Sequence, residues 1–269
     1  MQPYPAVALS AERNLLLRLS YDGTRYHGWQ VQRNAQSVQS VLQDALFPVL
    51  GGVHDLKGCS RTDTGVHARE YFVSVKTENG ISPLRLQAAL NNRLPRDIAV
   101  LDCREVPLDF HARYSCTGKE YVYQIWNSRV KNPFLFPYSM PYPYELCTEQ
   151  LNDAAQAYCG THDFTSLCSA GSKKQDNTRT VFRFSVERDG PLVTMTTAAD
   201  GYLYNMVRIM VGTLLRIAQG KLAPDALPAV IAAKDRSAAG PTAPACGLFL
   251  NRVFYGNNTA EGDDRNDGK

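Results

Sequence analysis

The feature that most constrains the fold of this chain is the order in which strand-like and helix-like patterns follow one another. In the first half, Ser37 precedes one helical pattern and Ser82-Pro83 begins another, with an N-cap serine and a proline at the first helical position. The expected elements are a strand, a helix, two strands, a helix and a strand, over residues 14–21, 38–46, 53–57, 71–77, 83–92 and 98–103. This β-α-β-β-α-β order is typical of a ferredoxin-like unit.

The second half predicts the same order. We expect Thr148 to cap its first helix, and Asp189-Gly190 to form the turn of a hairpin. The expected strand, helix, hairpin, long helix and final strand cover residues 119–126, 148–158, 181–197, 203–218 and 248–255, with a shorter helix after residue 224. We therefore expect an α+β protein of two tandem ferredoxin-like units with mainly antiparallel sheets.

The patterns divide the chain into two domains and two tails. We expect an N-terminal α+β domain over residues 13–108 and a C-terminal α+β domain over residues 109–256. Residues 1–12 and the acidic tail 257–269 are expected to be disordered. The formal net charge of +3 is mildly basic. It is compatible with a phosphate-bearing partner but does not establish one.

Cysteine usage and hydropathy limit the compartment and the class of protein. The seven cysteines form no C-x-x-C pair and their number is odd, so neither a disulfide framework nor a zinc site is expected. Residues 1–12 lack the charged start and apolar core of a signal peptide. The most apolar segment, residues 206–218, contains two arginines and is too short to span a bilayer. We expect a cytoplasmic protein with no membrane segment and no metal.

A carboxylate stands at a turn between two expected strands, in the segment from Gly58 to Ala68. Asp63 lies there beside Arg61, small hydroxyl residues and Gly65. Arg61 and nearby amides could keep the carboxylate ionised, which a nucleophile or a base requires. The same residues could form an Asx turn, in which Asp63 caps its own backbone and Gly65 supplies a positive φ. Both interpretations stay open on these residues alone.

Aromatic residues and one arginine supply further candidates. Tyr121 and Tyr123 share one face of an expected strand, because side chains there alternate with a period of two. Such an aromatic face is usually core, but it also stacks nucleic-acid bases, at roughly 1–3 kcal/mol per base. Arg208 interrupts the most hydrophobic helix. A buried arginine needs an anionic partner, in a structural salt bridge or in a site.

Together these segments resemble the family of tRNA pseudouridine synthase A. The matching pieces are Tyr-Asp-Gly-Thr-x-Tyr-x-Gly-Trp-Gln at 21–30, Arg-Thr-Asp-x-Gly-Val-His-Ala at 61–68, Asn-x-x-Leu-Pro-x-Asp-Ile at 91–98, Phe-His-Ala-Arg at 110–113, Lys-x-Tyr-x-Tyr at 119–123, His-Asp-Phe-Thr-Ser at 162–166, Met-Val-Arg at 206–208 and Gly-Leu-Phe-Leu at 247–250. The likeness covers roughly residues 13–255. The chain departs from the pattern at Glu70-Tyr71, where the family carries glycine and glutamine, and this leaves the packing beside residue 63 open.

The resemblance implies a central catalytic cleft and the conversion of uridine to pseudouridine at positions 38–40 of the tRNA anticodon stem-loop. By motif position, Asp63 is implied as the catalytic nucleophile and Tyr121 as the residue that packs against the target base. Arg208 is implied to pair with the aspartate, Arg61 to lie beside it, and Leu248 to close the floor of the pocket. The family works without cofactor or metal, as a homodimer whose tRNA contacts both subunits.

Several points stay open at this level. Asp63-Thr64-Gly65 also matches the aspartic protease signature, but that chemistry needs two carboxylates sharing one proton, and the chain has no second such motif. A non-catalytic RNA-binding protein with ferredoxin-like sheets is the alternative function. Lys173, Lys174 and Arg179 are either phosphate contacts or a solvated loop. The pattern does not decide which uridines are modified, how the dimer is arranged, or whether Asp63 attacks C1′, attacks C6 or removes the 2′ proton.

Overall fold

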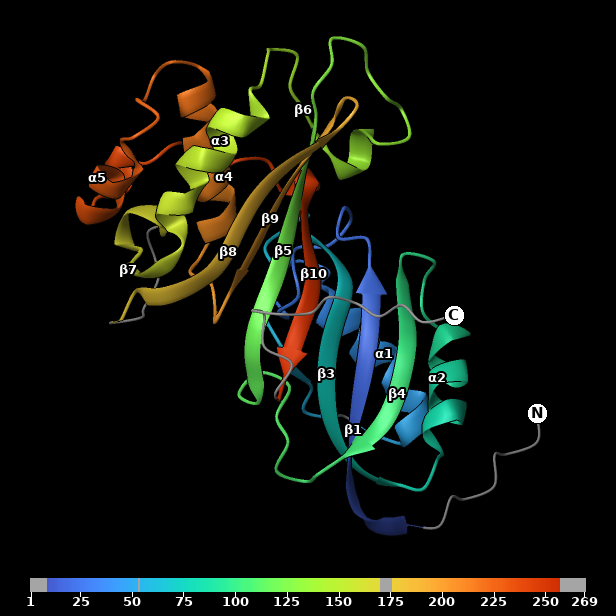
Figure 1. Ribbon diagram of the computed structural model, residues 1–269. Helices are drawn as coiled ribbons and strands as arrows, with labels where there is room; N and C mark the ends of the chain where they lie inside the picture. The colour runs from blue at the N-terminus through green and yellow to red at the C-terminus, as the bar shows by residue number, and fades with distance from the viewer. Residues whose placement is uncertain (1–8, 53, 170–175, 257–269) are drawn as a thin grey trace, which may run out of the picture. The chain divides into compact units, whose positions relative to one another are not determined.

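The computed structural model describes residues 9–52, 54–169 and 176–256 (Figure 1). The chain divides into two compact units, residues 1–116 and 117–269. Each unit contains a β-α-β-β-α-β series of elements in a mostly antiparallel sheet. This confirms the expected α+β fold class.

The first unit follows the predicted element order. Its elements are β1 (Leu9–Tyr21), α1 (Val38–Leu50), β2 (Lys57–Gly58), β3 (His67–Asn79), α2 (Pro83–Asn91) and β4 (Ile98–Val106). β1 lies between β4 and β3, and β2 pairs with β3; all three pairings are antiparallel. In Figure 1, α1 lies behind these strands. The core between sheet and helices is aliphatic and includes Leu15, Leu17, Val73, Leu42, Leu46, Leu86 and Leu90.

Local chemistry determines where the two helices of this unit begin. The Ser37 side chain accepts a hydrogen bond from the Ser40 amide, and the Ser40 hydroxyl in turn accepts one from the Ser37 amide, which is a capping box. Ser82 caps α2, and Pro83 is its first residue. Both starts were predicted, because these signals lie within four residues of the helix they begin.

Two expectations for the strands of the first unit need correction. The strand expected over residues 53–57 is reduced to β2, and residue 53 lies outside the described residues. The His54 ring bonds to the Lys76 carbonyl, so a side chain replaces the backbone ladder there. β1 begins at Leu9, within the segment 1–12 that we expected to be disordered. The rest of that segment and the tail 257–269 lie outside the described residues, and the predicted domain limits stay predictions.

The second unit adds short elements to the same series. Its strands are β5 (Cys116–Trp126), β6 (Met140–Pro141), β7 (Gly160–Asp163), β8 (Thr178–Asp189), β9 (Leu192–Ala199) and β10 (Leu248–Tyr255). Its α-helices are α3 (Thr148–Ala155), α4 (Met206–Ala218) and α5 (Leu227–Ala232). Single 3-10 turns cover Phe136–Tyr138, Gln156–Tyr158, Thr165–Leu167, Arg236–Ala238 and Ala245–Gly247. The strand order is β10-β5-β9-β8-β7, and β6 runs parallel to β5.

The start of each major helix in the second unit differs from the prediction. Thr148 is the first residue of α3 rather than its cap, and Cys147 holds the cap position without a side-chain hydrogen bond. α4 begins at Met206, three residues later than expected, because Asn205 has a left-handed backbone with φ of 61°. The fully buried Tyr158 donates a hydrogen bond to the Met210 carbonyl, which ties the end of α3 to α4. The hairpin of β8 and β9 and the bounds of β10 are as predicted.

Candidate active site

Asp63 lies in the loop between β2 and β3, in a well-defined turn. The Val66 amide donates to the Asp63 carbonyl at 3.2 Å, and Gly65 between them has φ of 77°. A positive φ at the third residue of such a turn is the geometry that favours glycine. The Asp63 side chain is half-buried, and the neighbouring Arg61 and Thr64 are exposed. The positive φ expected at Gly65 is therefore present.

A second loop, residues 22–30, lies directly against this turn. The Trp29 amide donates to the Thr62 carbonyl at 3.3 Å, and the Gly65 amide donates to the Tyr26 carbonyl at 3.1 Å. Gly28 has φ of +76°, and a Cβ on it would lie 2.2 Å from the Thr62 carbonyl oxygen. The backbone on either side of Asp63 is thus held by contacts with a loop from another part of the unit.

Three aromatic rings pack beneath the turn. The Trp29 and Tyr71 ring centroids are 4.4 Å apart, and those of Tyr21 and Tyr71 are 5.6 Å apart. The Tyr71 hydroxyl donates to the Ser60 carbonyl, and the Tyr21 hydroxyl bonds to the Thr62 hydroxyl at 2.9 Å. Tyr71 is fully buried. Tyr71, at which the chain departs from the family pattern, therefore packs against and bonds to the segment that carries Asp63.

His67 is a buried structural residue at the start of β3. The residue is 1% exposed, and its ring Nδ1 lies 3.1 Å from the Gly23 amide nitrogen and 3.0 Å from an Asp22 carboxylate oxygen. These contacts fix loop 22–30 to the strand that follows the Asp63 turn. Apart from the presence of Asp22 and His67 in the two motifs, nothing in the sequence indicates these contacts.

Tyr121 and Leu248 lie on the adjacent strands β5 and β10 of the second unit. Tyr121 is 6% exposed and packs against the Tyr202 ring in a T-shaped arrangement, with the centroids 5.1 Å apart. The Tyr202 hydroxyl donates to the Thr197 hydroxyl, and burial raises the pKa of Tyr202 well above its ordinary value. Leu248 is buried and is the first residue of β10. Sequence reasoning missed Tyr202, which lies far from Tyr121 in the chain.

Arg208 projects from the first turn of α4, and its side chain is held by one backbone carbonyl and one side-chain amide. Its Nε donates to the Ala243 carbonyl at 2.6 Å, its Nη1 donates to the Asn205 side-chain oxygen at 3.0 Å, and its own carbonyl accepts from the Ala243 amide. The carbonyl of Pro244, the residue after Ala243, accepts a hydrogen bond from the Tyr123 hydroxyl at 2.8 Å. The segment 243–244 thus links Arg208 to the strand that carries Tyr121.

The predicted site residues therefore fall into two sets. Asp63 and Arg61 belong to the first unit, and Tyr121, Arg208 and Leu248 to the second. Their roles stay predictions. Of the expected phosphate contacts, Lys173 and Lys174 lie outside the described residues. Arg179 lies on β8, and its guanidinium donates to carbonyls of its own segment.

Two kinds of feature are absent from the described residues. No three His, Cys, Asp or Glu side chains in that part of the chain lie together as a metal-binding group. None of the helices described is both long and apolar enough to cross a membrane.

A family model described as tRNA pseudouridine synthase matches residues 19–115 and 154–256. A relative named tRNA pseudouridine synthase A, from Acetivibrio thermocellus, is 44% identical to this chain over 243 residues. These residues cover 90% of this chain and all of that protein. This chain belongs to the tRNA pseudouridine synthase A family. The relatives of that name from Thermoanaerobacter sp. and Geobacillus kaustophilus are 43% and 42% identical, over 90% and 88% of this chain and 100% and 92% of theirs. The protein is an isomerase that acts on tRNA.

The matched ranges cover four of the five predicted site residues. Asp63 and Arg61 fall in the first range and Arg208 and Leu248 in the second, whereas Tyr121 lies between the two. A solved structure titled as a Cbf5-Nop10-Gar1 complex aligns with 87% of this chain and 57% of that chain, at 11% identity. Its TM-score of 0.36 is too low to bear on the site.

Proposed function

We propose that this synthase isomerises uridine to pseudouridine at positions 38–40 of the tRNA anticodon stem-loop, with Asp63 as the nucleophile. The observation that carries the proposal is the fixed backbone on either side of Asp63. Catalysis requires a reacting group held in one geometry, and the contacts from loop 22–30 supply this. We also propose that the enzyme works as a cytoplasmic homodimer without metal or cofactor.

The reaction breaks the N1–C1′ glycosidic bond of the target uridine, turns the uracil, and joins C5 to C1′. C5 then loses its proton and N1 gains one, so the product is an isomer of the substrate. The Asp63 carboxylate either adds to C1′ or to C6 or removes the 2′ proton, and any of these needs the ionised form. In this proposal Arg208 balances the negative charge, since its guanidinium is already oriented by Ala243 and Asn205. Arg61 lies beside the nucleophile, and Leu248 closes the floor.

Tyr121 is proposed to pack against the base during the reaction. The target nucleotide must leave its stack, which costs a few kcal/mol. Stacking on an aromatic ring returns roughly 1–3 kcal/mol. The T-shaped contact with the Tyr202 ring holds the Tyr121 ring in place, so little side-chain freedom is lost on binding.

The test is tritium release from tRNA that carries 5-tritiated uridine. Asp63→Asn should slow release by on the order of 10⁴-fold and leave the melting temperature and tRNA binding close to those of the wild type. Asp55→Asn is the matched control, because Asp55 is an exposed carboxylate of the same unit that pairs with Lys57. Equal activity of the Asp63→Asn and Asp55→Asn variants would refute the assignment of Asp63. Mapping of the modified positions tests 38–40 separately, and a wild type that binds tRNA without release would favour the non-catalytic alternative.

A further inference from the structure

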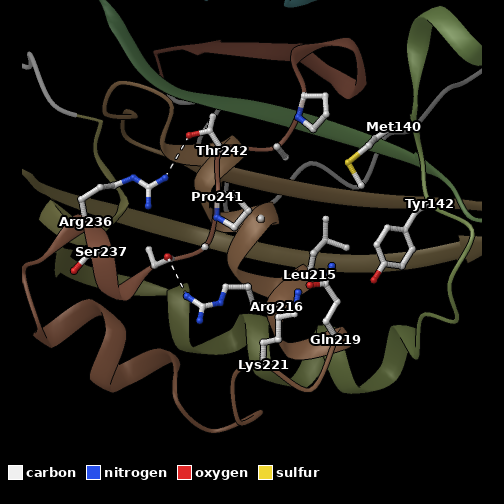
Figure 2. A pocket seen from close by; sticks show the side chains of 15 residues that line it. Met140, Tyr142, Leu215, Arg216, Gln219, Lys221, Arg236, Ser237, Pro241 and Thr242 are labelled. Carbon is white, nitrogen blue, oxygen red and sulfur yellow. Dashed lines mark hydrogen bonds between the residues drawn. The ribbon is translucent and has the colours of Figure 1, made fainter.

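A pocket of about 550 Å³ lies in the second unit, apart from every residue assigned above to the reaction. Figure 2 shows its lining, which comes from the C-terminal half of α4, the segment after α5 and the start of β6. The polar lining includes Arg216, Gln219, Lys221, Arg236 and Thr242. The opposite side is formed by Met140 and Tyr142.

The lining contains three cations and no carboxylate. Arg216 donates to the Ala239 carbonyl at 3.5 Å and Arg236 to the Thr242 hydroxyl at 3.4 Å; both contacts are long and both acceptors are neutral (Figure 2). Within the described part of the chain, neither arginine nor Lys221 forms an ion pair with an acidic side chain. Asp235, the residue before Arg236, accepts hydrogen bonds from Ser237 and does not line the pocket.

Half-buried arginines without a carboxylate favour an anion from outside. Both arginines are half-buried, and the cost of desolvating a guanidinium is offset when an oxyanion accepts its hydrogen bonds. The charged donors are two planar guanidinium groups and the ammonium of the exposed Lys221, which suit the oxygens of a phosphate. The Thr242 hydroxyl and the Gln219 amide could supply uncharged donors.

The wall of the pocket is firmly built. A Cβ on Gly212 of α4 would lie 1.8 Å from the Pro241 carbonyl oxygen, so the segment 239–244 lies directly on the helix. The Gly240 amide also donates to the Thr213 hydroxyl at 2.9 Å. The other side of the same segment bonds to Arg208 through Ala243. An anion held by Arg236 and Thr242 would therefore contact the residue next to Ala243, which bonds to Arg208.

We infer that this pocket binds a backbone phosphate of the RNA substrate, outside the nucleotide that reacts. The inference rests on the proposed function, which supplies an RNA ligand with many phosphates. Phosphate contacts of this kind position a nucleic acid rather than read its sequence. A phosphate bound by Arg236 and Thr242 would contact the same segment that holds Arg208 through Ala243, so substrate binding and the position of that guanidinium are linked.

The experiment measures the affinity for unmodified tRNA across a range of salt concentrations. Arg236→Gln and Arg216→Gln should each weaken binding by about tenfold and reduce the slope of log affinity against log salt by about 0.7–0.9. Arg236→Lys should restore most of the slope, because it restores the charge. Lys234→Gln is the matched control, since Lys234 is a cation of the same unit already paired with Asp163 at 2.8 Å.

The outcomes distinguish an RNA phosphate from a free phosphate compound. They also distinguish a failure of this inference from a failure of the proposed function. An unchanged salt slope in both glutamine variants, with melting temperatures near that of the wild type, would overturn the inference. If titration with inorganic phosphate shows a site that the variants lose while their tRNA slope is unchanged, the pocket serves a free phosphate compound and the RNA assignment is overturned. Because binding is measured rather than tritium release, a wild type without activity would refute the proposed function and leave this test intact.

Discussion

Replacement of Gly28 by alanine tests whether the contacts of loop 22–30 set the position of Asp63. Gly28 has φ of +76°, and its added Cβ would lie 2.2 Å from the Thr62 carbonyl oxygen. Ordinary carbon contacts begin near 3.5 Å, so the two loops must separate by about 1 Å. A displacement of about 1 Å in a catalytic group can cost about 10²-fold in rate, or about 2.7 kcal/mol of activation free energy. We expect Gly28→Ala to lower turnover in the tritium assay by about that factor.

Gly51→Ala is the matched control for this experiment. Gly51 also has a left-handed backbone, with φ of +84°, but an added Cβ there meets no atom within 4 Å. Both variants carry the strain of alanine in that region, about 1–2 kcal/mol, which should lower the melting temperature by about 2–4 °C for each kcal/mol. Only Gly28→Ala should lose activity at temperatures where both variants are folded. If its turnover equals that of Gly51→Ala, the contact with Thr62 does not position the nucleophile.

Two further outcomes are expected. Tyr71→Phe removes the hydroxyl that bonds to the Ser60 carbonyl and leaves the ring, so it should cost about 1 kcal/mol of unfolding free energy in denaturant titrations, and an unchanged free energy would contradict the role of that bond. The Lys234 ammonium and the Thr165 hydroxyl lower the pKa of Asp163 in the folded protein. The stability that the Lys234–Asp163 pair contributes is therefore complete above the ordinary carboxyl pKa of about 3.9. It is lost as the pH falls through the lower pKa of the folded state. Lys234→Gln should therefore lower the melting temperature at neutral pH and have a smaller effect in acid, and an equal effect at both would contradict it.

The sequence predicted the fold best where the signals were local. Ser37 and Ser82 determine the starts of α1 and α2 through bonds to residues three positions away, and β10 has the predicted bounds. The short β2 was not predictable, because the bond between the His54 ring and the Lys76 carbonyl forms only in the folded protein. The start of α4 shifted because Asn205 adopts a backbone conformation that apolar spacing does not indicate.

The candidate site shows the same division. The turn at Asp63 could be predicted, since Gly65 two residues later marks its geometry. The contact of Tyr121 with Tyr202 and the bond of Arg208 to Ala243 could not, because each joins residues that only tertiary folding brings together. The departure at Tyr71 was visible in the sequence, but its bond to the Ser60 carbonyl was not.

The close fit of loop 22–30 to the nucleophile turn has a consequence for how such enzymes can be recombined. Gly23 and Gly28 leave no room for a side chain between the two backbones, since a Cβ on either would overlap a carbonyl of the turn. A chimera that imports one loop from a relative would bring a mismatched surface to this junction. Both loops must be exchanged together for the hybrid to keep its active geometry. They therefore behave as one structural unit, although they are far apart in the sequence.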